Sequence, residues 1–561
     1  MKQTITRPPV TRLLIPLLTV ALVFSCASPT SISRRDIRGA EKLIGVQFTN
    51  EEIDVLRNYL VQNRQGFDSV RAVPAGINTS PALYFDPRPA HFNRQSQAGP
   101  SDWRLSERDT DMIGNDDQIA FLSVAELSIL IRTRKISSLR LTRIYLNRLK
   151  RFGDTLQAVV SITEQLALKQ AQRADEELAR GLYRGPLHGI PYGLKDLFAV
   201  PGYKTTWGAE PYQHQLLPDT AKVYQRLEAA GAVLVAKLTT GALARGDVWF
   251  GGKTKNPWDL KQGASGSSAG SASATAAGLV AFSIGTETLG SILAPSSRCG
   301  ATGLRPTFGR VSRGGCMTLA WSMDKAGPIC RSAQDRALVF NAIYGPNHPE
   351  PDRSVVPGPF TFNPPADLSK LRIAYFDKLF ARDTAHRITN DSALHILRRL
   401  GATLTPVSLP DSIPFAGFDI ILRAESGAFF DELVLAHRDR ELGEQDESSR
   451  ANSLRQSRFI PAVEYLQANR QRTALIEKMN ALLSRYDVIV ATAEGFNLSM
   501  ATNLTGHPAI SLPTGLDKRG RPTSVVLYSN LYDEGTLLEA AFLFQQASGF
   551  HQLRPKMFSE N

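Results

Sequence analysis

The sequence is poor in cysteine, with 4 in 561 residues, which excludes a small fold held together by disulfides. Apart from Cys26 there are only Cys299, Cys316 and Cys330. We expect these three to be buried, unreactive thiols, and a bridge between Cys316 and Cys330 is the alternative. Neither a Cys-x-x-Cys pair nor a histidine cluster offers metal-ligand spacing. The sequence therefore predicts no metal site and no organic cofactor.

Long apolar runs are also scarce, and the mean hydropathy of −0.17 excludes a polytopic membrane protein. The run LLIPLLTVALVF near the start is too short to form a stable transmembrane helix. It follows a segment that contains Lys2, Arg7 and Arg12 but no acidic residue, and it precedes Ser25-Cys26. This order of a basic segment and a short apolar segment is typical of a signal peptide.

The end of that segment, Val-Phe-Ser-Cys, resembles a bacterial lipobox, in which the cysteine is lipidated. Residues 1–25 are therefore predicted to be a lipoprotein-type signal peptide, and Cys26 a lipid anchor to a membrane. An ordinary signal peptide cut at another position is the alternative. Either interpretation predicts an exported protein, held by its anchor in the bacterial cell envelope, in the periplasm or at the outer membrane.

Aromatic residues are only 8% of the chain, and they do not cluster with its basic residues. Basic residues outnumber acidic ones by 65 to 53, which gives a formal net charge of +12. The stretch RTRKISSLRLTR is typical of the solvated side of a helix, and HRDREL mixes both signs. Because nucleic-acid binding requires a clustered basic surface, we expect no nucleic-acid partner.

With 42% hydrophobic and 21% charged residues, the composition is that of a globular protein. Residues 26–120 are predicted to be a tether followed by a helical and extended N-terminal extension, and residues 121–561 the main domain. Short apolar runs there alternate with helix-like stretches, which predicts an α/β fold with a mixed, twisted β-sheet covered by helices. The apolar runs are GAVLVAKL, LVAFSIG, LRIAYF, DVIVATA and HPAISLP. Residues 410–480 break the alternation with charged helical segments and are interpreted as a variable region over the core.

The run GASGSSAGSASATAAG, residues 263–278, consists of glycine, alanine, serine and threonine alone. A flexible linker is one interpretation of such a run. However, its second half is rich in alanine, which favours a helix, and it continues without a charge into the apolar run LVAFSIG. Small residues let backbone segments approach closely and leave main-chain N–H groups free to bind a ligand.

Three stretches together resemble the amidase signature family of serine hydrolases: GPLHGIPYGLKDLFAVPGYKTTWGAE, the run at 263–278, and GTETLGSILAPSSRCGATGLRPTFGRVS. The resemblance extends from about residue 121 to NLTGHPAISLPTG near the end of the chain. It implies the amidase signature fold and hydrolysis of the C–N bond of a small-molecule or peptide amide. It also places the variable region 410–480 on the substrate side.

The resemblance implies a Ser-cisSer-Lys triad, with Lys195 as the base, Ser267 as the proton relay after a cis peptide bond, and Ser291 as the nucleophile. A serine hydroxyl becomes a good nucleophile only when a base removes its proton. Lysine acts as a base only when neutral, so the pKa of Lys195 must fall towards neutrality. Four successive backbone N–H groups are expected to form the oxyanion hole: those of Thr288, Leu289, Gly290 and Ser291.

The chain departs from the family around its nucleophile. Where the family has Asp-x-Gly-Gly-Ser-Ile-Arg, this sequence has Glu-Thr-Leu-Gly-Ser-Ile-Leu, residues 287–293. Leu289 keeps a backbone N–H, which can serve the oxyanion hole unless that position requires a positive φ. Leu293 removes the arginine that would pair with the acidic residue, and we expect Arg298 to replace it as the partner of Glu287.

Two other serine motifs could carry different chemistry. Residues 266–270 match the G-x-S-x-G nucleophile elbow, but the preceding PWDLKQGA is not an apolar strand and no downstream histidine stands out. Ser322 and Lys325 match S-x-x-K, but the companion motifs K-T-G and S-D-N are missing. We therefore expect neither motif to be the active site.

Three further polar residues lie within the family motifs. His188 and His507 are expected to be structural histidines. Asp196, next to the predicted base, has two interpretations that the sequence leaves open: it orients the local backbone, or it tunes the lysine.

The resemblance leaves more than one function open. The first is an amidase that forms an acyl-enzyme on Ser291. The second is a catalytically inert, amidase-like binding lipoprotein, which the reactivity of Ser291 would distinguish from the enzyme. The third is the glutaminase-type A subunit of a tRNA-dependent amidotransferase, which the export signal disfavours because its tRNA partners are cytoplasmic. The sequence specifies neither the amide nor the oligomeric state.

Overall fold

The computed structural model describes residues 32–73, 76–90, 92, 99–103, 105, 114–346 and 349–559. The predicted signal peptide and Cys26 lie outside the described residues. The chain divides into two compact units, one that ends at Ala75 and one that begins at Gly76.

The smaller unit is a pair of helices, α1 (Arg34–Ile44) and α2 (Asn50–Arg71). Ser33 and Thr49 cap them, and each forms a capping box with the acidic residue three positions later. Both helices lie within residues 26–120, for which the sequence predicts a tether followed by a helical and extended extension. In the described part of the chain, no helix is long and apolar enough to span a membrane.

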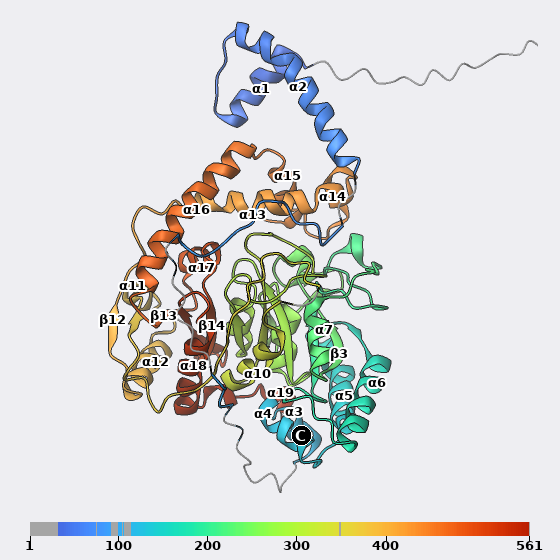
Figure 1. Ribbon diagram of the computed structural model, residues 1–561, viewed down its shortest axis with the longest axis vertical. Helices are drawn as coiled ribbons and strands as arrows, with labels where there is room; N and C mark the ends of the chain where they lie inside the picture. Colours follow the sequence, from blue (N-terminus) through green and yellow to red (C-terminus); the bar gives the residue numbers. More distant parts are fainter. Residues whose placement is uncertain are drawn as a thin grey trace, which may run out of the picture. The chain divides into compact units, whose positions relative to one another are not determined.

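The larger unit is built around a mixed sheet of 11 strands (Figure 1). Four neighbouring pairs of strands are parallel and six are antiparallel. In spatial order the strands are β1 (Val159–Ile162), β3 (Val233–Leu238), β2 (Pro191–Lys195), β8 (Phe282–Glu287), β10 (Lys325–Cys330), β9 (Thr302–Arg305), β14 (Ala509–Leu516), β15 (Pro522–Ser529), β13 (Val488–Thr492), β11 (Ile373–Tyr375) and β12 (Leu404–Pro406). Each of the five apolar runs singled out in the sequence contributes one of these strands, which confirms the predicted α/β class.

Two short hairpins lie outside the sheet and pair β4 (Val248–Trp249) with β5 (Gly252–Lys253) and β6 (Lys255–Asn256) with β7 (Asp259–Gly263). The helices of the larger unit are α3 (Asp116–Ala120), α4 (Val124–Arg132), α5 (Ser138–Leu156), α6 (Glu164–Ala179), α7 (Lys222–Ala229), α8 (Ala269–Ala276), α9 (Leu293–Cys299), α10 (Ala333–Ile343), α11 (Asp377–Arg382), α12 (Arg387–Arg399), α13 (Phe415–Phe429), α14 (Asp431–Leu435), α15 (Arg450–Ser457), α16 (Ala462–Leu483), α17 (Phe496–Leu504), α18 (Glu534–Ser548) and α19 (Lys556–Ser559). Short 3₁₀ helices span Glu210–Tyr212, Ala242–Ala244, Arg438–Glu441 and Phe550–Gln552.

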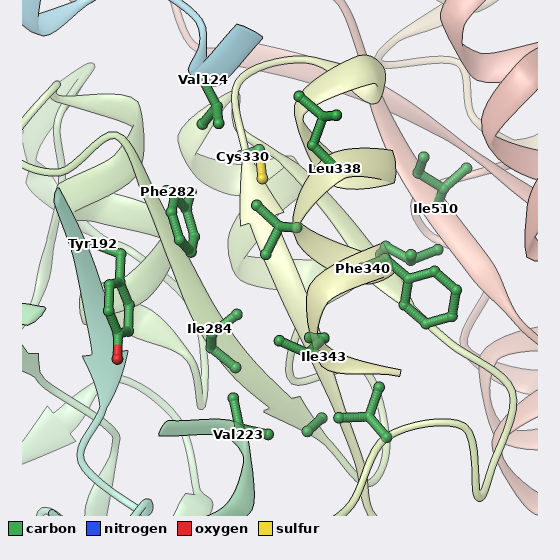
Figure 2. Packing of buried hydrophobic residues seen from close by; sticks show 14 of the residues in the cluster. Val124, Tyr192, Val223, Phe282, Ile284, Cys330, Leu338, Phe340, Ile343 and Ile510 are labelled. Carbon is green, nitrogen blue, oxygen red and sulfur yellow. The ribbon is translucent and has the colours of Figure 1, made fainter. Parts of the chain in front are cut away.

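The hydrophobic core lies between the sheet and its covering helices (Figure 2). Tyr192 of β2 stacks on Phe282 of β8 with their ring centroids 5.2 Å apart. From the other side of this cluster, α10 contributes Leu338 and Phe340, which lie close to Ile510 of β14 (Figure 2). Burying a side chain of this size stabilises the fold by roughly 1.5–3 kcal/mol. The interior strands β2 and β8 are thus held in place by their packing in this core.

The run at 263–278 is not a linker. Its second half forms α8, whose residues are all buried. This helix contacts α9 and the strands β2, β3, β8 and β10, so it lies directly against the sheet. Alanine, glycine and serine are the residues that allow such a close approach of helix to sheet.

Residues 410–480 are helical, as the sequence predicts, and in Figure 1 their helices α13, α15 and α16 lie together in orange at one end of the larger unit. The helix α13 packs against both α15 and α16. Arg423 of α13 donates a hydrogen bond of 2.5 Å to the side chain of Gln456 in α15. These helices form a separate layer beyond the ends of the central strands.

Residues 76–90 contain neither a helix nor a strand and lie along the surface of the larger unit. Phe85 packs edge-on against Phe308 with the ring centroids 4.9 Å apart. The guanidinium of Arg472 in α16 lies 3.5 Å from the centroid of the Phe85 ring. This segment is therefore anchored to α16 by its aromatic side chain.

Candidate active site

Lys195 is the last residue of β2, between the parallel strands β3 and β8, and its side chain is fully buried. Its Nζ lies within hydrogen-bond distance of three hydroxyl oxygens: Ser267 Oγ at 2.8 Å, Ser268 Oγ at 3.0 Å and Thr286 Oγ1 at 2.8 Å. Burial lowers the pKa of Lys195 from its usual 10.5 to about 7. A substantial fraction of this lysine is therefore neutral near pH 7, as a general base requires.

The hydrogen bonds around Lys195 limit which hydroxyl can give it a proton. Ser268 Oγ donates to the carbonyl oxygen of Thr286 at 3.0 Å, so its single proton is already used. It also accepts from the backbone N–H of Thr286 at 3.1 Å. Towards the lysine, Ser268 can then only accept, which leaves Ser267 and Thr286 as possible donors to a neutral amine.

Ser267 follows a cis peptide bond, Gly266–Ser267, as the family resemblance implies. A Cβ atom on Gly266 would lie 1.8 Å from the carbonyl oxygen of Gly246, so only glycine fits at this position. The backbone N–H of Ser268 donates to the carbonyl oxygen of Ser291 at 3.1 Å. This bond ties the turn that carries Ser267 to the loop that carries Ser291.

The loop with the predicted nucleophile follows β8 and leads into α9. Its positive φ falls on Gly290, at 84°, and not on Leu289. Leu289 therefore does not need the positive φ that a leucine rarely adopts, and its backbone N–H remains available for the predicted oxyanion hole. Glu287 accepts hydrogen bonds from the backbone N–H groups of Ile292 at 2.8 Å and Leu293 at 3.0 Å, which closes the loop around its buried carboxylate.

The prediction that Arg298 pairs with Glu287 is wrong. Arg298 lies in the last turn of α9 and is exposed, where a basic side chain interacts favourably with the helix dipole. The buried partner is Arg305 at the end of β9, whose Nη1 lies 2.9 Å from Glu287 Oε1. Burial alone would raise the pKa of Glu287, but Arg305 and the loop N–H groups lower it below its usual value. Asn503 completes the cluster with a bond of 3.0 Å to the same oxygen.

Thr288, one of the predicted oxyanion-hole residues, is held by a residue that the sequence did not single out. Its hydroxyl donates to the buried carboxylate of Asp324 at 2.5 Å. The other oxygen of Asp324 accepts from the backbone N–H groups of Leu319 and Ala320 at 2.7 and 3.1 Å. Asp324 thus fixes Thr288 relative to the loop that precedes β10.

The structure separates the two residues of the S-x-x-K motif. Ser322 Oγ donates to Glu425 at 2.6 Å and accepts from Arg472 at 2.7 Å. Lys325 Nζ instead donates to the carbonyl oxygen of Asn503 at 3.4 Å. Ser322 therefore has no lysine base beside it, in agreement with the expectation that the S-x-x-K motif is not the active site.

The histidines and the aspartate in the family motifs have structural partners. His188 is buried with Nε2 2.9 Å from the carbonyl oxygen of Ala174. Burial lowers the pKa of His507 to about 3, so this side chain is neutral at physiological pH. Asp196 forms a buried ion pair of 2.7 Å with Lys237, which supports the interpretation that it orients its surroundings.

The three cysteines of the described chain are free and buried, without the alternative Cys316–Cys330 bridge. Burial raises the pKa of each thiol, as expected for unreactive cysteines. Among the residues with described positions, no three His, Cys, Asp or Glu side chains are grouped so that they could hold a metal ion.

A cavity of about 440 Å³ opens in front of the predicted nucleophile. One wall comes from the core and one from the helical layer of residues 410–480, so the two parts of the chain meet at this cavity. The core contributes Ala244, Arg245, Gly246, Gly266, Thr288, Leu289, Ser291 and Leu319. Residues 410–480 contribute Asp419, Leu422 and Arg423 from α13, Glu447, Ser448 and Ser449 from the turn before α15, and Arg450, Ser453 and Gln456 from α15. The size is in the range of pockets that hold small molecules.

Comparison with known proteins gives a consistent result. The family model described as Amidase matches residues 140–496. Over 489 residues the chain is 31% identical to a protein of Carboxydothermus hydrogenoformans, the A subunit of its glutamyl-tRNA(Gln) amidotransferase. This match covers 78% of the present chain and 100% of the relative.

Solved structures resemble the same part of the chain. Native peptide amidase from Stenotrophomonas maltophilia superposes with a TM-score of 0.68 and 30% sequence identity, over 76% of this chain and 97% of that protein. A bacterial aryl acylamidase of the amidase signature family shares the fold with a TM-score of 0.68, at 20% identity, over 79% of this chain and 99% of that protein. By its family model, its relatives and its fold, the chain belongs to the amidase signature family of hydrolases that act on carbon–nitrogen bonds.

Proposed function

We propose that the protein hydrolyses a carboxylic amide through an acyl-enzyme on Ser291. The observation that carries this proposal is the fully buried Lys195, with a pKa of about 7, in contact with Ser267 beside the cavity that Ser291 lines. Perturbed pKa values cluster at functional sites, and a neutral amine in contact with a serine hydroxyl has the form that a general base needs.

In the first step, Ser291 Oγ attacks the amide carbon and its proton passes to Ser267, which gives its own proton to the neutral amine of Lys195. In the second step the C–N bond breaks, and the same relay returns the proton to the leaving nitrogen. Water then attacks the ester on Ser291 and gives a proton through Ser267 to Lys195. When the bond between Ser291 Oγ and the acyl carbon breaks, the same relay returns this proton to Ser291 Oγ, and the carboxylic acid leaves. Each half-reaction therefore returns the lysine to the form in which it started.

The negative charge on the amide oxygen is proposed to be stabilised by backbone N–H groups of the loop after β8. Removing one such donor typically slows a reaction by roughly 10²–10³. The loop geometry supports this assignment, because the hydrogen bonds from the N–H groups of Ile292 and Leu293 to Glu287 hold the loop in one arrangement. The donors are the N–H groups of Thr288, Leu289, Gly290 and Ser291.

Fluorophosphonate labelling of the protein from Ala27 onwards tests the nucleophile directly. We expect the wild type to be labelled, Ser291→Ala to lose the label, and Lys195→Ala to react much more slowly. Ser322→Ala is the matched control, because Ser322 is bound by Glu425 and Arg472 rather than by a base. A folded wild type that takes no label would support an inert binding lipoprotein instead.

A second candidate is the glutaminase-type component of an amidotransferase, which the similarity to the protein of Carboxydothermus hydrogenoformans supports. The proposed export of this chain argues against it, since tRNA is cytoplasmic. Fractionation of cells that express the full chain separates the two candidates. Recovery in the cytoplasm as a complex with other proteins would favour the amidotransferase.

For the cell location, we propose that Cys26 carries a lipid that anchors the exported protein in the cell envelope. The sequence around Ser25-Cys26 supports this proposal. Cys26→Ala is expected to move the protein from the detergent phase to the aqueous phase in a detergent-partition experiment. An equal distribution of both proteins would contradict the anchor.

A further inference from the structure

Arg336 lies near the start of α10, and its side chain is 0% exposed. A guanidinium loses favourable hydration when it is buried, so buried arginines are normally bonded to carboxylates or carbonyl oxygens. Burial lowers the pKa of Arg336 only to about 9, so the side chain still carries its charge near pH 7.

The guanidinium of Arg336 has no such partner. In the part of the chain that the structure describes, none of its three nitrogens, Nε, Nη1 and Nη2, takes part in a hydrogen bond. Other arginines that are equally buried differ in this respect. Arg305 is paired with Glu287 at 2.9 Å, and Arg472 Nε donates to the carbonyl oxygen of Leu504 at 2.6 Å. Arg336 is therefore a buried positive charge whose five N–H groups are unused.

A second unused polar group belongs to His551, in the short 3₁₀ helix that follows α18. Its Nδ1 is buried and also lacks a hydrogen-bond partner. Burial and the positive charge of Arg336 together lower the pKa of His551 to about 4, so the ring is neutral and lies within the field of the guanidinium. The helices α10 and α18 pack against each other, which brings the two side chains together. A neutral histidine that carries its proton on Nδ1 adds one more donor.

The ionisable groups around Arg336 do not neutralise its charge. Asp335, the preceding residue, is bound instead to a backbone N–H at the start of α4 at 3.1 Å. Glu126, whose charge also acts on His551, closes the capping box of that same helix. Cys330 is a thiol whose pKa is raised by burial, so it is uncharged near pH 7. The charge of Arg336 thus remains without a counter-charge in contact with it.

We propose that Arg336 and His551 bind a small inorganic anion, such as chloride, in the interior of the fold. The anion accepts hydrogen bonds from the guanidinium and from His551 Nδ1–H, and its charge compensates the buried positive charge. A single-atom anion suits a site closed to solvent better than phosphate, which is larger and costs more to dehydrate. Bound there, it links the segment after α18 to α10. Because neither residue lines the cavity of Ser291, this inference does not depend on the proposed amidase function.

Thermal unfolding of the purified protein in sodium chloride and in sodium gluconate, at equal ionic strength, tests the site. An anion that binds only the folded state raises the unfolding midpoint until the site is saturated. We expect chloride, but not the much larger gluconate, to raise the midpoint of the wild type by at least about 2 °C, relative to Arg336→Met, which gives the baseline for general salt effects. The same response of both proteins to the two salts would overturn the inference.

Further variants separate the anion site from other effects of charge. His551→Asn keeps an N–H donor close to the position of Nδ1 and should retain most of the chloride response, whereas His551→Phe should lose most of it. Arg298→Met is the matched control, because Arg298 is an exposed arginine, and it should respond to chloride as the wild type does. A response that is lost equally in Arg298→Met would show that the effect is one of net charge and would contradict the site.

A readout on the wild type does not depend on any variant folding. Crystals soaked in sodium bromide should show an anomalous bromide peak in contact with the guanidinium of Arg336 and with His551 Nδ1. Ordered water at that position, or bromide peaks at the protein surface alone, would show that the buried charge is hydrated and that the inference is wrong.

Discussion

The substitution Thr286→Val tests whether the hydroxyl cluster around Lys195 sets the pH at which the site becomes active. Thr286 Oγ1 accepts a hydrogen bond of 2.8 Å from Lys195 Nζ, and valine has nearly the same shape without the hydroxyl. A hydrogen bond to a charged group contributes about 1.5–3 kcal/mol, against about 0.5–1.5 kcal/mol for a neutral pair. Losing it should therefore destabilise the ammonium more than the amine by about 1–1.5 kcal/mol, which lowers the pKa of Lys195 by about one unit.

The assay is the second-order rate constant of fluorophosphonate labelling between pH 5 and 9. In the wild type, with the pKa of Lys195 at about 7, the rate rises as the pH passes through 7 and is level above it. From that pKa, the rate at pH 6 should be about one tenth of the level part. In Thr286→Val it should be about one half, because the inflection moves to about pH 6. The ratio is independent of any change in the absolute rate.

The control is Thr275→Val, which removes a buried hydroxyl 2.8 Å from Ser283 Oγ and away from the lysine. Its inflection should remain where the wild type has it. An inflection in Thr286→Val that stays at pH 7 or moves upward would refute the reasoning, because Thr286 would then not stabilise the charged lysine.

Other predictions concern the stability of the fold and the close approach of backbone segments at Gly266. Burial lowers the pKa of Lys195 from 10.5 to about 7, so the buried ammonium destabilises the fold fully below pH 7 and progressively less as the pH rises to 10.5. In urea titrations, Lys195→Met should therefore raise the unfolding free energy by a few kcal/mol below pH 7 and leave it unchanged near pH 10.5. Gly266→Ala should abolish fluorophosphonate labelling, since its Cβ would lie 1.8 Å from a backbone oxygen; normal labelling would contradict the close approach. Arg305→Met should cost about 3–5 kcal/mol in the same titrations by leaving buried Glu287 unpaired, whereas Arg298→Met should be nearly neutral.

The sequence predicted the parts of the fold that have strong local patterns. The runs that became β3 and β13 consist largely of apolar residues, and α8 follows from the alanines of the small-residue run. The strands β2 and β10 lack such a pattern, because they contain glycine and proline where the sheet is most crowded. A Cβ on Gly193 of β2, for example, would lie 2.3 Å from Leu238 Cδ1 of the neighbouring strand.

In the site, the family motifs pointed to the three side chains of the proposed triad, but not to the residues that hold them. Arg305 replaces the arginine missing at position 293, and the sequence favoured Arg298 only because it is nearer along the chain. The contact with Glu287 depends on β9 lying beside β10 and β14, which is a property of sheet order and not of local sequence. The wall of the cavity that faces Ser291 comes from helices far along the chain, so no spacing rule could connect it with this serine.

The origin of the two cavity walls has a consequence for how such proteins diverge. The proposed reacting groups all lie between residues 195 and 291, on strands and turns fixed by the sheet, whereas the facing wall comes from residues 419–456. Changes in that wall can alter which molecule is accepted without moving the atoms that break the bond. Exchanging the segment from α13 to α15 between relatives would therefore be a way to transfer a preference for one amide onto an unchanged reaction centre.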